Sequence, residues 1–324
     1  MRNIIIASML LSLPALFSCA GTKKETQEKP ETTDAAAPAL VFNADSAYSY
    51  LKRQVDFGPR PNNTTAHDKT AAWLESELRR HGAEVVVQDA TLRSADGVDL
   101  KARNIMGMYN PQATDRLLLL AHYDTRPWAD EDPDPAKRKS PVPGANDGAS
   151  GVGILLEIAR LLGASSPSRG VDILFVDAED RGSHSDDESW ALGARYFAEN
   201  PIIEGYSPSE AILLDMTGAA GATFPREQYS ALYAPDLQNR IWALAAASGY
   251  SDFFIDGRGS AVTDDHVQLI QAGIPAIDII DIRQDSPNGF FKAWHTTADD
   301  MPLIDKRTLK AVGQTVTNYI FPAE

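Results

Sequence analysis

Acidic and imidazole side chains stand at the ends of four short apolar runs in this sequence. The runs cover residues 117–121, 171–176, 211–214 and 274–280. The polar residues at or near their ends are His122, Asp124, Asp177, Glu179, Asp180, Asp215, Asp278 and Asp281. Carboxylates crowded into one pocket raise one another's pKa values unless a cation neutralises them. If these side chains meet, a bound divalent metal ion is therefore expected.

Asp147 and His295 are two further candidates for this site. Asp147 lies just before a predicted helix, where an isolated Asp is more often an N-cap than a ligand. Four strand ends that share the same pattern nevertheless favour the metal interpretation. Imidazole and carboxylate without thiolate suit Zn²⁺, and a catalytic zinc keeps three protein ligands and one open position. The residues thus predict a zinc enzyme acting on an amide or ester, without choosing the reaction.

The elements between these residues predict the fold class. Apolar periodicity predicts helices at 67–81, 151–162, 237–248 and 306–320, and the segments 84–93 and 98–109 form a β-hairpin. The four apolar runs lack polar alternation and are interleaved with helices, which is typical of strands buried on both faces of a sheet. We therefore expect an α/β protein: a single three-layer α/β/α domain with a central, mostly parallel mixed sheet. Sites in such sheets lie beyond the carboxyl ends of the strands, so the polar residues should converge on one crevice.

Composition limits the classes of partner. The 324 residues are 43% hydrophobic, which excludes a wholly disordered chain. Lys and Arg number 30 against 45 Asp and Glu, giving a formal charge of −15. So acidic a chain repels phosphate backbones, and nucleic acid is not expected as a partner. A single Cys cannot form an internal disulfide, so stability must come from the core, a metal ion or both.

The amino terminus has the pattern of an export signal. Residues 1–18 carry an early Arg and an apolar stretch too short for a comfortable membrane span. The Leu-Phe-Ser-Cys sequence ending at Cys19 resembles a bacterial lipobox, which would make Cys19 the lipidated residue of the mature protein; the alternative is an ordinary signal peptide whose Cys is discarded. Residues 19–41 are expected to form a flexible tether and 42–324 one domain. These features predict an exported lipoprotein, periplasmic or outer-membrane associated, that contacts the membrane only through its lipid.

Several short motifs follow one another along the chain: His122-Tyr123-Asp124, residues 146–151 (NDGASG), 177–180 (DAED), 213–215 (LLD) and Trp294-His295-Thr296. Together they resemble the M28 family of zinc exopeptidases. Residues 263–266 (TDDH) and 273–275 (GIP), together with the Trp-His-Thr run, look like the glutaminyl cyclase branch of that family, in particular its bacterial lipoproteins. The motifs occur in the expected order, which is more specific than any one of them.

The resemblance implies a role for each matching residue. The zinc ligands would be Asp147, Asp180 and His295, with Asp180 one methylene shorter than the Glu often found in the family. Glu179 matches the catalytic acid and base. Two buried carboxylates, Asp215 and Asp264, would bind near the substrate.

Four residues are assigned to the substrate pocket by the same resemblance. Trp294, Phe290 and Trp190 look like apolar walls, although ordinary core packing is an equally common role for such side chains. Asp278 stands where animal cyclases have His, so its part in catalysis is open. Residues 130–140, 186–188 and 284–292 are expected to be loops around the mouth of the site.

The implied reaction is cyclisation of the N-terminal glutamine of peptides and proteins to pyroglutamate, with release of ammonia. Because the nucleophile is the substrate's own amine, one Zn²⁺ per chain should suffice. An M28 aminopeptidase with two zinc ions remains an alternative, because His122 and Asp215 offer ligands for a second site. A third alternative is a surface lipoprotein that binds peptides in an inactive pocket.

Overall fold

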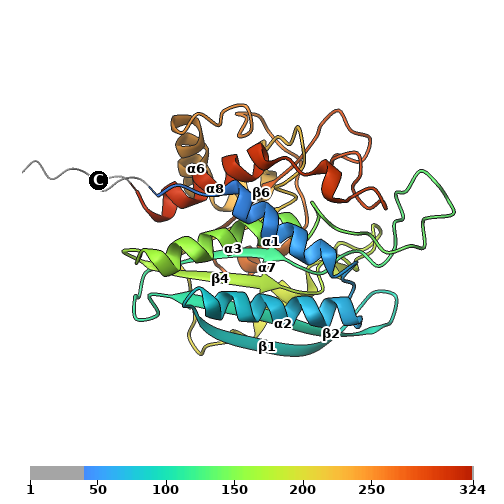
Figure 1. Cartoon of the computed structure of the whole chain (residues 1–324), viewed down its shortest axis with the longest axis horizontal. Coiled ribbons are helices and arrows are strands. Elements are labelled where there is room, and N and C mark those ends of the chain that lie inside the picture. Colours follow the sequence, from blue (N-terminus) through green and yellow to red (C-terminus); the bar gives the residue numbers. More distant parts are fainter. Residues whose placement is uncertain (1–39, 323–324) are drawn as a thin grey trace, which may run out of the picture. The chain divides into compact units, whose positions relative to one another are not determined.

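The computed structural model describes residues 40–322 (Figure 1). The predicted signal peptide 1–18, the proposed lipid site Cys19 and nearly all of the tether 19–41 lie outside these residues. In the described part of the chain, no helix combines the length and apolar character needed to cross a membrane.

The expected elements are present in the described residues, with helices that the sequence analysis did not predict. The strands are β1 (Glu84–Arg93), β2 (Asp99–Tyr109), β3 (Arg116–His122), β4 (Gly170–Val176), β5 (Glu210–Asp215) and β6 (Ala276–Ile280). The helices are α1 (Ala44–Asp56), α2 (Thr65–Arg80), α3 (Ala149–Ala164), α4 (Leu192–Glu199), α5 (Gln228–Tyr233), α6 (Pro235–Ala247), α7 (Asp265–Gln271) and α8 (Lys306–Ile320). The helices α1, α4, α5 and α7 were not expected.

Within residues 40–322 the strands form one sheet with the order β1-β2-β4-β3-β5-β6. The β1–β2 hairpin pairs antiparallel with β4, whereas β4, β3, β5 and β6 run parallel. The predicted mixed, mostly parallel sheet is confirmed. Among the strands the largest difference from the predicted bounds is in the run at 274–280, which becomes a strand only at Ala276. The Ile274 N–H instead donates to Leu269 O and closes the end of α7.

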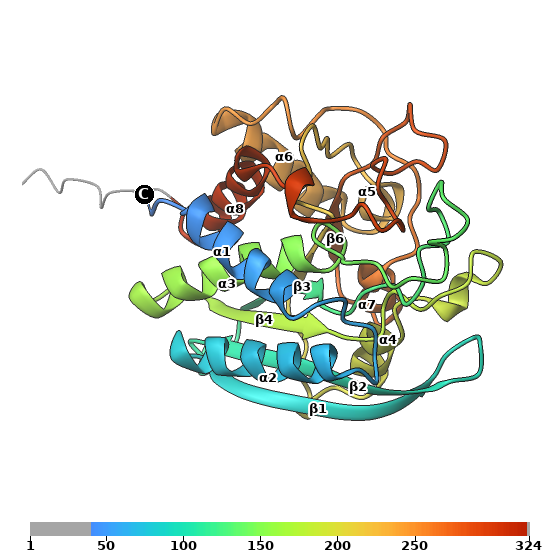
Figure 2. The ribbon, with the colours of Figure 1, turned by 45° about the vertical axis from the view of Figure 1, so that its right-hand side comes forward.

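Helices cover both faces of the sheet (Figure 2), and a hydrophobic core fills the space on each side of it. Leu117 and Leu119 of β3 pack in the core that includes α1, α2, α3, α6 and α8. Leu118 and Leu120 point the other way, into the core with α4 and α7. Successive side chains of a strand point to opposite faces, so a strand covered on both sides must be apolar at every position. The three-layer α/β/α architecture is thereby confirmed.

Candidate active site

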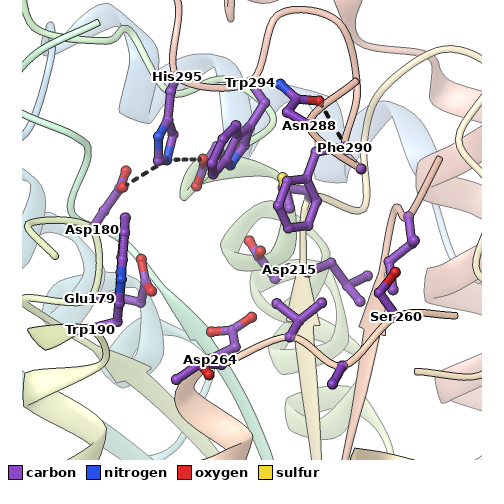
Figure 3. Close-up of a pocket in the computed structure, with 18 of the residues that line it drawn as sticks. Glu179, Asp180, Trp190, Asp215, Ser260, Asp264, Asn288, Phe290, Trp294 and His295 are labelled. Atoms are coloured by element: carbon purple, nitrogen blue, oxygen red, sulfur yellow. Dashed lines mark hydrogen bonds and ion pairs between the residues drawn. The ribbon is translucent and has the colours of Figure 1, made fainter. Parts of the chain in front are cut away.

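A cavity of about 510 Å³ lies beyond the carboxyl ends of the parallel strands (Figure 3). One part of its lining is acidic and another aromatic. The residues among its lining that the sequence analysis singled out are Asp147, Glu179, Asp180, Asp215, Asp264, Trp190, Phe290, Trp294 and His295. The structure thus brings together side chains that are up to 148 positions apart, counted from 147 to 295.

The three predicted metal ligands face one another. His295 Nε2 lies 3.3 Å from Asp180 Oδ1 and 3.7 Å from Asp147 Oδ2, and one ligand atom from each residue falls within 4.8 Å of the others. All three side chains are buried. Among the described residues, neither carboxylate oxygen of Asp180 has a hydrogen-bond partner. Buried, unpartnered acceptors of this kind are costly unless a cation binds them, so the donor set fits a metal ion.

A second donor set shares Asp147. His122 Nε2 lies 3.1 Å from Asp147 Oδ1 and 3.2 Å from Asp215 Oδ1. The two oxygens of Asp147 therefore face different groups of ligands. This arrangement is compatible with one metal ion or with two ions that share Asp147.

Asp147 points into the cavity because it does not cap the following helix. The N-cap of α3 is Gly148, with φ 100°, and no side chain caps this end of the helix. The Asn146 and Asp147 N–H groups instead donate to the buried Asp299 carboxylate at 2.8 and 3.0 Å. The alternative interpretation of Asp147 as an N-cap is therefore wrong.

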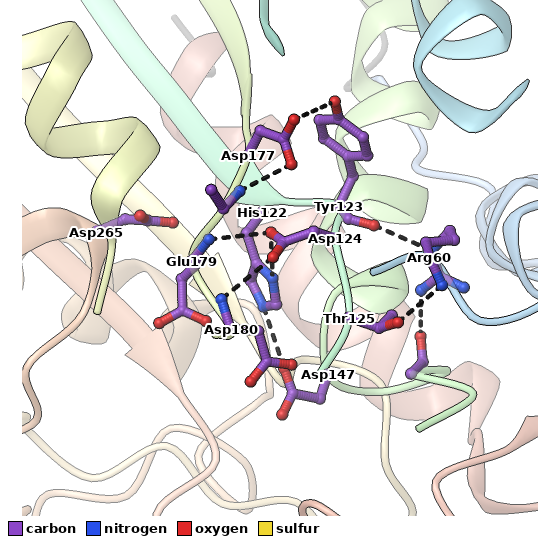
Figure 4. Close-up of polar contacts among 12 residues, drawn as sticks. Arg60, His122, Tyr123, Asp124, Thr125, Asp147, Asp177, Glu179, Asp180 and Asp265 are labelled. Carbon is purple, nitrogen blue, oxygen red and sulfur yellow. Dashed lines mark hydrogen bonds and ion pairs between the residues drawn. The ribbon is translucent and has the colours of Figure 1, made fainter. Parts of the chain in front are cut away.

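In the loop that follows β4, two backbone N–H groups likewise donate to a buried carboxylate (Figure 4). The Glu179 and Asp180 N–H groups donate to the two oxygens of Asp124 at 3.1 and 3.2 Å. Ala178 has a left-handed backbone, φ 55°. The carboxylate of Asp124 is thus used to fix the loop, and Glu179 and Asp180 project into the cavity.

Two acids expected in the crevice lie elsewhere. Asp177 accepts hydrogen bonds from Asn62, His67 and the Tyr123 hydroxyl, on the side of β4 that faces α2. Asp281 is paired with Arg283. A position after a strand does not determine where a side chain points, because the backbone turns there and side-chain direction changes from one residue to the next.

Burial changes the acid–base properties of the pocket. Burial, followed by repulsion from neighbouring carboxylates such as Asp180, raises the pKa of Glu179 well above its usual value. Burial also raises the pKa of Asp215 to about 7. Burial lowers the pKa of His295 far below its usual value, with Arg126 adding to the effect, so this imidazole is neutral and suited to coordinate a metal.

Asp264 and Asp278 occupy different depths. Asp264 lines the cavity, and its carboxylate caps α7 by accepting the Asp265 N–H at 2.6 Å. Asp278 is fully buried in β6 and is not among the residues that line the cavity. Contrary to expectation, it lies beneath the pocket wall, next to Asp264 and His266.

The three aromatic residues are walls of the cavity and not members of the main core. The Phe290 and Trp294 ring centroids are 4.7 Å apart, and Trp190 stacks on His295 at 6.0 Å with an angle of 20° between the rings. Asn288 of the lining lies in the segment 284–292, which was expected at the mouth of the site. Two other residues of the lining, His184 and Tyr229, were not predicted. They come from loops or a short helix, and no local pattern marks them.

Comparison with known proteins identifies the family. The model described as Peptidase family M28 matches residues 104–320, about two thirds of the chain. This chain belongs to peptidase family M28. The match contains Asp147, Glu179, Asp180 and His295, so the family's region and the cavity coincide.

Solved structures similar to this M28 protein include two bacterial glutaminyl cyclases. It is 48% identical to Bacteroides thetaiotaomicron glutaminyl cyclase bound to N-acetylhistamine, with a TM-score of 0.85, covering 88% of this chain and all of the other. It is 50% identical to Porphyromonas gingivalis glutaminyl cyclase, also with a TM-score of 0.85, covering 87% of this chain and 98% of the other.

A more distant relative has a different activity. The M28 protein is 26% identical over 260 residues to aminopeptidase YwaD of Bacillus subtilis (strain 168), a match that covers 76% of this chain. The match spans half of the length of that relative.

Proposed function

We propose that this M28 protein is a glutaminyl cyclase, which converts N-terminal glutamine of peptides and proteins to pyroglutamate and releases ammonia. The observation that carries the proposal is the identity of 48–50% over nearly the whole length of two bacterial glutaminyl cyclases. The buried acid Glu179 and the donor set Asp147, Asp180 and His295 supply the groups that the reaction needs.

The donor set suits Zn²⁺, because it combines two carboxylates with a neutral imidazole and leaves one face open to the cavity. When bound there, zinc would polarise the γ-carbonyl of the substrate and stabilise negative charge on its oxygen. Two zinc-independent tasks remain for the protein: moving a proton and holding the substrate in a folded conformation.

Glu179 is the group that moves the proton. In the reaction the α-amine nitrogen forms a bond to the γ-carbon, and the bond from that carbon to the amide nitrogen breaks. Glu179 accepts a proton from the attacking amine and returns it to the leaving nitrogen, which departs as ammonia. Its raised pKa, caused first by burial, suits a carboxylate that must hold the proton between these steps.

The other lining residues position the substrate. Asp215 and Asp264 present carboxylates on the wall of the cavity, where each can accept a hydrogen bond from the α-amine (Figure 3). Trp190, Phe290 and Trp294 form an aromatic wall that would shield the bound glutamine side chain from water. When the pocket holds the amine and the carboxamide close together, the substrate loses conformational entropy on binding and not in the transition state, which lowers the barrier of the reaction.

The experiment that tests the proposal uses the purified mature chain with zinc and a peptide that begins with glutamine. We expect one ammonia to be released per peptide, with a mass loss equal to ammonia and no incorporation of labelled water oxygen. An otherwise identical peptide that begins with asparagine is the control. Release of free glutamine with uptake of water oxygen would contradict the proposal.

The aminopeptidase alternative is favoured by the second donor set of His122, Asp147 and Asp215. A dinuclear peptidase would bind two zinc ions per chain and release N-terminal residues by hydrolysis. Metal analysis of the active protein, made together with the peptide assay, separates the two functions. We propose that one zinc ion per chain supports turnover.

We further propose that the protein is an exported lipoprotein anchored through Cys19. The proposal is supported by the apolar segment and the Leu-Phe-Ser-Cys sequence that precede the tether. Full-length protein expressed in a bacterial host should incorporate labelled palmitate and sediment with membranes, and C19S should do neither. Equal labelling of C19S would contradict it.

A further inference from the structure

His295 has an unusual backbone, and its two ring nitrogens face different residues. Its φ is 54°, in the left-handed region that a residue with a side chain rarely adopts without support. Nε2 faces the carboxylates of Asp147 and Asp180. Nδ1, the other ring nitrogen, is buried and has no hydrogen-bond partner among residues 40–322. Trp190 and Trp294 stack on the ring and limit its tilt, but an acceptor at Nδ1 is needed to fix which ring nitrogen carries the proton.

The charged loop at residues 130–132 makes hydrogen bonds to the segment that carries His295. The Glu131 N–H donates to the His295 carbonyl oxygen at 3.2 Å. Two residues further on, Asp132 Oδ2 accepts hydrogen bonds from the Thr297 N–H at 3.0 Å and the Thr297 hydroxyl at 2.6 Å. Consecutive loop residues therefore contact the segment that carries the ligand.

Asp130, the first residue of this loop, faces the imidazole of His295. Its Oδ1 lies 3.6 Å from His295 Nδ1, and its Oδ2 lies 3.3 Å from Nε2 of the half-exposed His184. Asp130 is in turn held by Arg126, whose Nε and Nη2 donate to the two carboxylate oxygens at 2.7 and 2.6 Å. A two-pronged contact of this kind fixes the plane of a carboxylate as well as its position.

Arg126 also connects the other parts of the site. Its Nη1 donates to the carbonyl oxygens of Asp180 and Gly182 at 3.1 and 3.3 Å. The guanidinium carbon lies 4.9 Å from the ring centroid of Trp190, which packs directly against Gly182: a Cβ added there would lie 2.0 Å from the indole. One buried guanidinium thus contacts the segment of the ligand Asp180 and the aromatic wall directly, and it reaches His295 through Asp130.

We propose that Asp130 is the positioning residue of His295 and that Arg126 positions Asp130. Asp130 would accept the Nδ1–H of the ring, which fixes the tautomer that leaves Nε2 free for the metal. Carboxylates that accept the second N–H of a metal-binding histidine orient the ring and make it a better ligand, and losing them typically weakens metal binding 10- to 100-fold. The inference rests on the proposed function for the assignment of His295 as a zinc ligand. It implies that the charged loop at 130–132 positions this ligand.

The test compares D130N with D134N, a matched change at an exposed acid of the same loop. Zinc affinity is measured by competition with a chelator, without substrate, and the Co²⁺-substituted proteins are compared by visible absorption. We expect D130N to bind zinc about 10- to 100-fold more weakly and to have a shifted cobalt spectrum. D134N should match the wild type in both measurements, and D130E should recover part of the affinity.

Failure of this inference and failure of the proposed function give different results in these measurements. A folded D130N protein with wild-type affinity and spectrum would overturn the inference alone, whereas a wild-type protein that binds no zinc would overturn the proposed function. If D130N does not fold, R126K serves in its place, because an ammonium group keeps the charge but cannot hold both oxygens of Asp130. Wild-type zinc affinity in R126K would then contradict the inference.

Discussion

Glu179 is a residue whose chemical role can be separated from its place in the structure. It lines the cavity directly before the predicted ligand Asp180, and its backbone N–H donates to Asp124. Its side chain belongs to neither of the two donor sets. Removal of its charge should therefore affect proton transfer and leave metal binding intact.

We expect E179Q to lower kcat by about 10²- to 10⁴-fold, the usual contribution of a general acid or base. Zinc content and peptide binding should stay at wild-type levels, as measured by metal analysis and by calorimetry with a glutamine-initiated peptide. E188Q, a change at an exposed acid of a nearby loop, is the control. Unchanged turnover in E179Q would remove Glu179 from the mechanism; turnover absent from both the wild type and E179Q, with peptide binding intact, would favour the non-enzymatic peptide-binding alternative.

The candidate site was only partly predictable at the residue scale. Asp147, Asp180 and His295 could be proposed from motifs, because each stands in a short sequence that resembles a motif of the M28 family. Asp130 and Arg126 gave no such signal, since their importance depends on contacts with residues more than 50 positions away. Asp177 shows the opposite case: its position after a strand predicted a site residue, yet its carboxylate accepts hydrogen bonds from Asn62 and His67 on the other side.

At the scale of elements, the start of α3 depends on a glycine. Gly148 has φ 100°, and a Cβ added there would lie 2.6 Å from the carbonyl oxygen of Asp124. Gly58 has a similar φ of 96° with nothing within 4 Å of the added atom. Alanine substitutions at the two glycines therefore separate the loss of stability caused by backbone conformation from the loss caused by steric overlap.

We expect G58A to lower the free energy of unfolding by about 1–2 kcal/mol, the backbone term alone. G148A should cost at least about 3 kcal/mol and should also weaken zinc binding, because it displaces Asp147 or Asp124. Urea unfolding of the two variants measures the difference. Equal losses in both would show that the close approach to Asp124 is relieved without cost.

The contact between α2 and the end of β4 should make stability depend on pH. Burial lowers the pKa of His67, but the adjacent Asp177 more than offsets this, and the net pKa is raised. The resulting stabilisation is fully present below the pKa of an unfolded His, about 6.5, and is lost as pH rises through the higher folded value.

Urea unfolding of the wild type and H67Q from about pH 6 to pH 9 tests this dependence. The stability difference between the two proteins should be largest at the acidic end and should shrink as pH rises. At His81, burial lowers the pKa, so the difference between wild type and H81Q should change in the opposite direction. A wild-type advantage over H67Q that grows with pH would contradict the assignment.

Most elements could be predicted because their patterns are strong. The strand β3 is apolar at every position from Leu117 to Ala121, as a strand covered on both faces must be. The helix α1 was missed for the converse reason: its buried residues are Ala47, Leu51 and Gln54, so only one large apolar side chain marks its inner face. It packs closely on α3 at Gly153, where a Cβ would lie 2.8 Å from Ala47 O, and this contact has no signal in the local sequence.

On the scale of the whole molecule, the metal ion should contribute to the stability of the fold. The cavity joins loops that follow β3, β4 and β5 with the segment before α8, and its buried carboxylates repel one another. Anything that binds the folded state alone stabilises it, by about 2.7 kcal/mol at a free concentration 100 times the dissociation constant.

Removal of zinc with a chelator should therefore lower the melting temperature by about 5–10 °C, and added zinc should restore it. Differential scanning calorimetry of chelated and reloaded protein measures the change. In D180N, which lacks one predicted ligand, the shift on reloading should be much smaller. A melting temperature that is the same with and without zinc would show that the carboxylates are accommodated by protonation instead.

The shared position of Asp147 has a consequence for how occupancy must be measured. One oxygen of this side chain lies toward His295 and the other toward His122, so a charge placed on either side alters the potential on the other. A metal titration of this protein therefore reports macroscopic constants of a coupled pair and not two independent equilibria. If an ion at one position weakens binding at the other, one zinc ion per chain is the expected stoichiometry even though each position has three donor residues.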